Sequence, residues 1–140
     1  GMYAVELGEL RMAAVVAVNA LGDIFDPSTG KKIAGLLTTD GTSFGDSCEE
    51  LWKMGRRENL FTGNTTIGAV FTNGKFNKAQ MNKIASMTRN AYARCINPVG
   101  TMADGDSIYA ASAGDVEADL NVAGTLAAYV MERAIVAAIR

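Results

Sequence analysis

Two apolar runs dominate the hydrophobic pattern of the chain, and both predict buried strands. Residues 10–21 (LRMAAVVAVNAL) are almost wholly apolar and rich in valine, which is typical of a strand covered on both faces. Residues 65–72 (TTIGAVFT) combine β-branched and aromatic side chains, so we expect a strand that begins at Thr65. The opening residues 1–5 have the pattern of the middle of a further strand.

Turn residues separate these runs from their neighbours. Residues 26–30 (DPSTG) place proline and glycine where a turn needs them. Residues 32–37 then predict a short strand, so residues 10–37 are expected to form a hairpin. Asn73-Gly74 predicts a turn at the end of the second apolar run.

A long polar segment precedes the second run. Glycine and hydroxyl side chains dominate residues 38–63, and one or two helical turns are expected at residues 48–54, behind Asp46 or Ser47 as the cap. A connection this long without firm structure is typical of a functional or mobile segment. It leads directly to Thr65.

Two later segments have the periodicity of helices. Asn77 and Gln80 match a capping box, and apolar residues at i, i+3 and i+4 spacing predict a helix that runs to about Ile96. Asp119 is the expected cap of a last helix, residues 120–140, whose apolar positions go nearly all the way round. Such a helix is packed on more than one side. The order of strands and helices predicts a layered α+β fold.

Composition fits one domain or part of one. The chain has 140 residues, 49% of them apolar and 20% charged, so it can bury a core. Its net charge of −2, with scattered basic residues, gives no electrostatic footprint for nucleic acid. The last helix has the length of a membrane span, but Asn121, Glu132 and Arg133 argue against one. We therefore expect neither nucleic acid nor a membrane as a partner.

The chain contains no histidine, which excludes Ser-His-Asp and Cys-His catalysis and every His-based zinc site. The two cysteines, Cys48 and Cys95, form neither a disulfide framework nor a metal cluster, and Cys95 is expected in the core. We expect no cofactor and no metal. A hydrolytic activity would need an amine, a carboxylate or a lysine as its base.

The stretch Gly63 to Val70 (GNTTIGAV) carries the candidate chemistry. Thr65 Oγ could attack the carbonyl of Asn64 and convert the amide to an ester, which water would then cleave. The new α-amine of Thr65, with a reference pKa of about 7.7 to 8.0, could act as the base for its own hydroxyl. The alternative is that Asn-Thr-Thr is only a turn at the entry of a strand.

Three other polar residues are candidates for the same site. Asn19 interrupts an apolar run, where its amide is either a structural cap or a donor aimed at a reaction centre. Asp104 and Asp106 flank Gly105. Asp104 lies in an expected loop at residues 101–105, and Asp106 begins an expected strand at residues 106–112. They are either a solvated turn or a pair that orients an amine or a hydroxyl network.

Taken together, these residues resemble the DmpA-type N-terminal-nucleophile hydrolases. That family includes L-aminopeptidase/D-amidase-esterases, β-peptidyl aminopeptidases and 6-aminohexanoate-oligomer hydrolases. The resemblance covers essentially the whole chain. It is carried in the same order by Val16–Gly22, Gly63–Ile67 and Asp104–Asp106, with the regions of Asn97-Pro98 and Asn121-Val122 between and after them.

The resemblance implies a four-layer αββα sandwich and an amidase or aminopeptidase that acts on small amides or short peptides. It implies self-cleavage between Asn64 and Thr65, which divides the chain into residues 1–64 and 65–140, and it makes Thr65 the nucleophile. It places Asn19 beside Thr65 as a ligand of the oxyanion or of the nucleophile. It places Asp104 and Asp106 in the network that positions Thr65. A homo-oligomer is also expected.

One departure from the family concerns the N-terminal side. Family members have a long portion before the Val-Asn-Ala-Leu-Gly strand, and it supplies further strands, pocket walls and a catalytic lysine. None of the six lysines here is in a matching position. We therefore expect the C-terminal portion of such an enzyme, which exposes apolar strand surface and needs the N-terminal portion as a partner. Residues 1–5 lack the features of a signal peptide, so the expected location is cytoplasmic.

Two alternatives to the hydrolase remain open. An acyltransferase of the ornithine-acetyltransferase type resembles this fold and also uses a cleaved threonine, but its Ala-Thr-Met-Leu motif is absent here. The other alternative is a non-catalytic remnant that folds or oligomerises without a complete active site.

Overall fold

The computed structural model describes residues 1–55 and 63–139, which contain two sheets and three helices. The larger sheet has the order β1-β2-β5-β7, formed by β1 (Met2–Leu7), β2 (Leu10–Ala17), β5 (Ile67–Gly74) and β7 (Ser107–Val116). The smaller sheet has the order β4-β3-β6, formed by β4 (Lys31–Ala34), β3 (Asp23–Asp26) and β6 (Ile96–Asn97). The helices are α1 (Ser47–Met54), α2 (Lys78–Cys95) and α3 (Leu120–Ile139). This mixture of elements confirms the α+β class.

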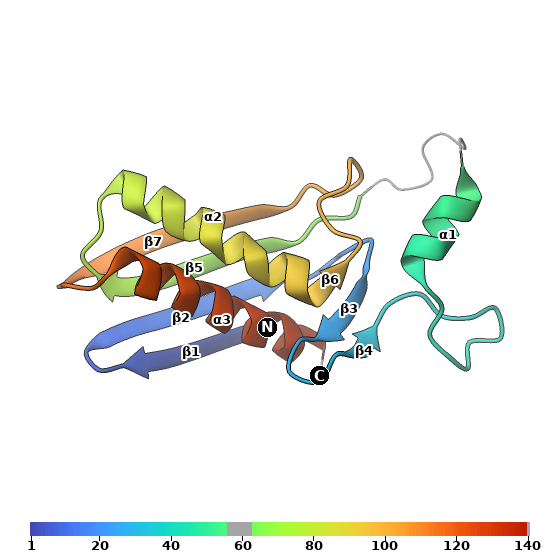
Figure 1. The fold of residues 1–140 in the computed structure, drawn as a ribbon, viewed down its shortest axis with the longest axis horizontal. Coiled ribbons are helices and arrows are strands. Elements are labelled where there is room, and N and C mark those ends of the chain that lie inside the picture. Colours follow the sequence, from blue (N-terminus) through green and yellow to red (C-terminus); the bar gives the residue numbers. More distant parts are fainter. Residues whose placement is uncertain (56–62, 140) are drawn as a thin grey trace.

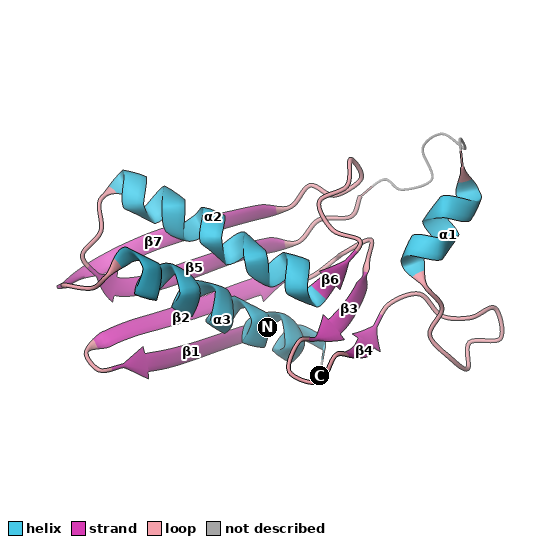
Figure 2. Cartoon of the chain, in the orientation of Figure 1, coloured by secondary structure: helices cyan, strands magenta, loops and turns pink. Residues whose placement is uncertain are grey.

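Helices α2 and α3 lie side by side across one face of the larger sheet, while α1 projects away from the sheets (Figures 1 and 2). Neighbouring strands of the larger sheet are antiparallel except β5 and β7, which are parallel. The parallel pair needs a crossover, and α2 provides it. The crossover therefore places a helix over the sheet between two adjacent strands.

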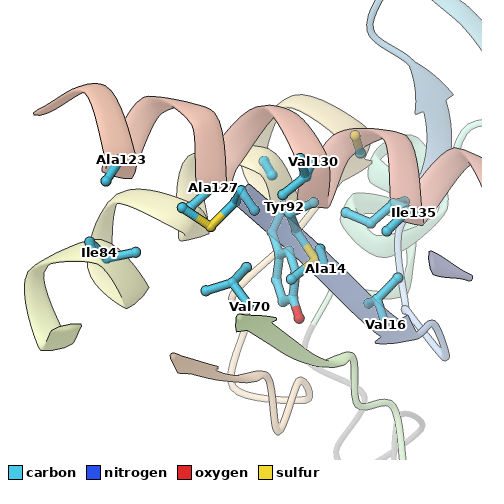
Figure 3. Close-up of a cluster of buried hydrophobic side chains, with 14 of the residues drawn as sticks. Ala14, Val16, Val70, Ile84, Tyr92, Ala123, Ala127, Val130 and Ile135 are labelled. Carbon is cyan, nitrogen blue, oxygen red and sulfur yellow. The ribbon is translucent and has the colours of Figure 1, made fainter. Parts of the chain in front are cut away.

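The core lies between these two helices and the sheet. Strand β2 turns Leu10, Met12, Ala14 and Val16 towards the helices, and all four are buried. Figure 3 shows Tyr92 of α2 and Val130 and Ile135 of α3 among the buried side chains that meet them. Small residues on α3 allow close helix packing, since a Cβ on Gly124 would lie 2.3 Å from the sulfur of Met87.

The predicted helices and caps are confirmed. Asn77 and Gln80 form the capping box of α2, and the Asp46 side chain accepts the N–H of Glu49 at the start of α1. Cys95 is fully buried, and burial raises the pKa of its thiol to about 12. Of the residues expected in the last helix and in the 38–63 segment, Arg140 and residues 56–62 lie outside the described residues.

Three strand predictions are wrong. Within the described residues, 10–21 do not form a strand covered on both faces, because β2 ends at Ala17, burial alternates along it and the helices lie over one face. The segment 10–37 is not one hairpin, because β2 pairs with β1 and β5 while β3 pairs with β4. The strand expected to begin at Thr65 begins at Ile67.

The turn predicted at Asn73-Gly74 is also wrong, because both residues complete β5. The Asn73 side chain accepts the N–H of Arg11 at 2.7 Å and donates to the carbonyl of Glu9 at 2.9 Å. These contacts bind the end of β5 to the β1–β2 hairpin. A long-range partner therefore overrides the local turn preference of Asn-Gly.

Helix α3 has the length and hydropathy of a membrane span. It also contacts α2, β1 and β2, and half of its most apolar stretch is buried by them. Packing on several sides accounts for its all-round apolar pattern.

Candidate active site

Three segments meet at one edge of the larger sheet because of its strand directions. Strand β2 runs antiparallel to β5, so the end of β2 lies beside the start of β5. Strand β7 runs parallel to β5, so both begin at this same edge. The edge therefore brings Asn19 next to Thr65 and next to the loop that carries Asp104 and Asp106.

The peptide bond between Asn64 and Thr65 is held from several directions. The Thr65 hydroxyl donates to the Asn64 carbonyl oxygen at 2.7 Å, and the Gly105 N–H donates to the same oxygen at 3.0 Å. The Thr65 N–H donates to the main-chain carbonyl of Asn19 at 2.8 Å. A hydroxyl, its neighbouring carbonyl and an independent donor thus meet at one bond.

Asn19 holds this segment on both sides of that bond. Its main-chain carbonyl accepts from Thr65, and its side-chain amide donates to the carbonyl of Gly63 at 2.8 Å. The structure therefore brings Asn19 and Thr65 together. The Asn19 amide, however, is directed at the Gly63 carbonyl rather than at the carbonyl of Asn64.

Asp106 supports the residue after the candidate nucleophile. One of its carboxylate oxygens accepts the N–H of Thr66 at 2.8 Å, and Ser107 N–H donates to the Thr66 carbonyl at 3.1 Å. Burial raises the pKa of Asp106 above its ordinary value, and the charge of Asp104 acts in the same direction. The hydrogen bond from Thr66 and the charge of Arg89 oppose this rise.

Asp104 folds the loop before Asp106. Its carboxylate accepts both the N–H of Thr101, at 3.0 Å, and the Thr101 hydroxyl, at 2.8 Å. In the described part of the chain, neither aspartate carboxylate forms a hydrogen bond with Thr65. The structure thus gathers the predicted residues at one site, with both carboxylates holding main chain around Thr65.

Tyr92 lies beneath this edge and was not predicted as a site residue. Its buried hydroxyl is 3.5 Å from the carbonyl oxygen of Thr66 and 3.4 Å from that of Ser107. Gly68 makes room for it, because a Cβ there would lie 2.7 Å from the hydroxyl oxygen. Burial raises the pKa of Tyr92, so the phenol stays protonated as a donor between β5 and β7.

A polar cavity of about 400 Å³ adjoins the site. Its lining includes Arg89, Tyr92, Thr101, Asp104 and Asp106. Within residues 1–55 and 63–139, no group of three or more His, Cys, Asp or Glu side chains is arranged to hold a metal ion. The groups gathered here include the Thr65 hydroxyl, main-chain N–H donors, two carboxylates, a guanidinium and a phenol.

Comparison with known proteins shows the family of this chain. Residues 2–140 match the sequence profile of peptidase family S58, and the chain belongs to that family. This confirms the resemblance inferred from the three sequence blocks.

Several curated proteins are similar in sequence to this chain over about three quarters of its length. An uncharacterized aminopeptidase of Mycobacterium leprae (strain TN) is 32% identical over 108 residues, which are 76% of this chain and 30% of that protein. A 6-aminohexanoate-oligomer endohydrolase of Kocuria sp. (strain KY2) is 27% identical over 113 residues, which are 79% of this chain and 32% of that protein. The aligned part thus spans about a third of these curated relatives.

Proposed function

We propose that this chain is the C-terminal part of an amide or peptide hydrolase that cleaves its own Asn64–Thr65 bond and then uses Thr65 as an N-terminal nucleophile. Membership of a peptidase family supports the hydrolase class, as do relatives named as an aminopeptidase and as an oligomer endohydrolase. The observation that carries the proposal is the 2.7 Å hydrogen bond from the Thr65 hydroxyl to the oxygen of the carbonyl whose carbon it would attack.

The atoms exchanged in self-cleavage all come from Asn64, Thr65 and one water molecule. Thr65 Oγ forms a bond to the Asn64 carbonyl carbon, and the carbon–nitrogen bond of the peptide then breaks. The hydroxyl proton passes to the departing nitrogen, so the amide becomes an ester with a free α-amine. Water hydrolyses the ester, which gives the carboxylate of Asn64 and restores the Thr65 hydroxyl.

The same amine is the proposed base in each later turnover. An α-amine has a reference pKa of about 7.7 to 8.0, so part of it is neutral near pH 7 and can accept the hydroxyl proton. The main-chain carbonyl of Asn19, which holds Thr65 nitrogen at 2.8 Å, is placed to orient it. Small amides or short peptides are the proposed substrates.

The remainder of the enzyme is the proposed partner of the uncovered sheet face. We call this the open face; it carries Met2, Val15, Ile67, Phe71 and Tyr109. Phe71 is 48% exposed and Tyr109 is 65% exposed. A hollow of about 610 Å³ beside Phe71 adds to the surface available for packing. A second sheet from the missing two thirds would cover this apolar surface and complete a layered αββα sandwich.

Charge on the open face is expected to block that assembly. We expect Phe71→Glu to prevent co-purification of this chain with the N-terminal portion when the two are co-expressed, because the charge would be buried between sheets. Met102→Glu, at a fully exposed loop position, is the control and should co-purify like the wild type. Equal recovery of both variants would contradict the sandwich.

Intact-mass measurement tests the proposed function directly. The purified chain, incubated alone and with the N-terminal portion, is expected to yield fragments of residues 1–64 and 65–140. Amidase activity should appear only in preparations that contain the cut species. A chain that stays uncut under both conditions would contradict self-cleavage. It would favour a non-catalytic remnant, in keeping with an alignment that spans only about a third of each relative.

A further inference from the structure

We infer that the main-chain N–H of Gly105 stabilises the oxyanion that forms on Asn64 during self-cleavage, and that Asp104 is a positioning residue for this N–H. The inference rests on the proposed self-cleavage. It gives Asp104 a role different from orienting the Thr65 amine by its charge.

The first observation is the pair of donors on the Asn64 carbonyl oxygen. The Thr65 hydroxyl donates at 2.7 Å and the Gly105 N–H at 3.0 Å. When Oγ attacks the carbonyl carbon it gives up its proton and stops being a donor. The electron pair of the carbonyl π bond moves to oxygen at the same moment. Gly105 N–H is then a fixed donor already directed at the new negative charge.

The second observation is the absence of a side chain at this donor. A Cβ on Gly105 would lie 2.8 Å from Thr65 Oγ. The φ angle of Gly105 is outside the left-handed region, so alanine could adopt this backbone conformation. Glycine is therefore required here for space beside the nucleophile and not for backbone freedom.

The third observation is how the loop holds Gly105 in place. Three hydrogen bonds between Asp104 and Thr101 close the turn. The Asp104 carboxylate accepts the N–H and the hydroxyl of Thr101, and the Asp104 N–H donates to the Thr101 carbonyl at 3.1 Å. On the other side, the Asp106 carboxylate accepts Thr66 N–H. Gly105 thus lies between two anchored neighbours: Asp104 is hydrogen-bonded to Thr101 in the same loop, and Asp106 to Thr66, the residue before β5.

These contacts separate a positioning role of Asp104 from a direct electrostatic one. Asparagine at position 104 keeps an acceptor for Thr101 but removes the charge. Valine at position 101 removes the hydroxyl donor but leaves the charge of Asp104 and the N–H of Thr101. If Asp104 acts through the loop, the first change is mild and the second is harmful. If it acts by charge on Thr65, the order is reversed.

The test measures the first-order rate of fragment formation by intact mass, over a range of pH, in the chain expressed together with the N-terminal portion. Gly105→Ala keeps the N–H, but its Cβ would lie 2.8 Å from Thr65 Oγ, so the donor and the hydroxyl cannot both keep their places. We expect cleavage to slow by up to about 10²-fold, the cost of losing one oxyanion donor. Thr101→Val should also slow it severalfold, while Asp104→Asn keeps most of the rate and an unchanged pH profile. Gly45→Ala is the glycine control, because the Cβ there would contact only Leu36, its side chain at 3.3 Å and its main-chain oxygen at 3.8 Å, and the position is outside the site.

Each outcome decides the matter. Thermal unfolding of each variant identifies a folding defect, and Thr101→Val keeps the test decisive if Gly105→Ala does not fold. Wild-type rates in Gly105→Ala, or a shifted pH profile in Asp104→Asn with no effect of Thr101→Val, would overturn the inference while leaving self-cleavage intact. An uncut wild type would overturn the proposed function and this inference with it.

Discussion

Replacing Thr65 by valine is expected to abolish the fragments 1–64 and 65–140 while leaving the chain folded. Valine has nearly the shape of threonine and keeps the β-branched backbone preference at this position. The Asn64 carbonyl would lose the hydroxyl donor at 2.7 Å but keep Gly105 N–H at 3.0 Å. The free energy of unfolding should therefore fall by only about 1 kcal/mol, the usual net value of one hydrogen bond.

Serine at position 65 is the matched control for this change. Thr65→Ser keeps the hydroxyl and removes only the methyl group, so cleavage is expected to continue at the same bond. Intact mass over time gives the extent of cleavage, and thermal unfolding shows whether each variant is folded. Cleavage of Thr65→Val between residues 64 and 65 would mean that another group attacks the bond.

Asp23→Ala is expected to lower the free energy of unfolding by about 3 to 5 kcal/mol, the range for breaking a buried ion pair from one side. Asp23 is 2% exposed and lies 2.6 Å from the ammonium of Lys32. Its carboxylate also accepts hydrogen bonds from the N–H of Leu36 and from the N–H and hydroxyl of Ser47. Alanine would leave these donors without their acceptor and would remove the side-chain contacts from β3 to Lys32 of β4 and to the start of α1.

The pH dependence of the stability that Asp23 contributes follows from the direction of its pKa shift. Burial acts to raise the pKa of Asp23, but the hydrogen bonds from Lys32, Ser47 and Leu36 together hold it below its ordinary value. A carboxylate with a lowered folded pKa contributes stability that is present above its unfolded pKa, about 3.9, and is lost as the pH falls through the folded value. Acid unfolding below about pH 4 should thus be less steep in Asp23→Ala than in the wild type.

Asp40→Ala is the control for Asp23, and urea denaturation at several pH values is the measurement. Asp40 also accepts hydrogen bonds, from Thr38 and Thr42, but it is exposed. Its loss should change the free energy of unfolding far less than the loss of Asp23. Similar free energies of unfolding for the two variants would show that the buried pair of Asp23 and Lys32 stabilises the fold no more than the exposed contacts of Asp40.

Local signals in the sequence were sufficient to predict the helices and their caps. The Asn77–Gln80 box and the Asp46 cap depend on residues three positions apart, and both formed as expected. The strands depended on partners that the pattern does not contain. Residues 10–17 read as buried on both sides because the open face is apolar too, although no element of the described chain covers it.

The candidate site was predictable only in part. Thr65, Asn19, Asp104 and Asp106 came from sequence blocks typical of a family, and the strand order brings them together. The contacts of the two carboxylates with Thr101 and Thr66 are set by the loop conformation, which spacing does not specify. Tyr92 reaches the site from a helix 26 residues away from Thr66, and its place among apolar neighbours made it look like core alone. A glycine between two aspartates was the one signal that could have indicated Gly105.

The pairing of β2 with β5 has a consequence for the molecule after scission. The ladder runs from Met12 opposite Thr72 to Ala17 opposite Ile67, and so it joins the polypeptide before residue 65 to the one after it. Helix α3, from the later polypeptide, also rests on β1 and β2 of the earlier one. The two products would thus share a single sheet and a single hydrophobic interior. They would stay associated as a heterodimer until the whole unit is denatured.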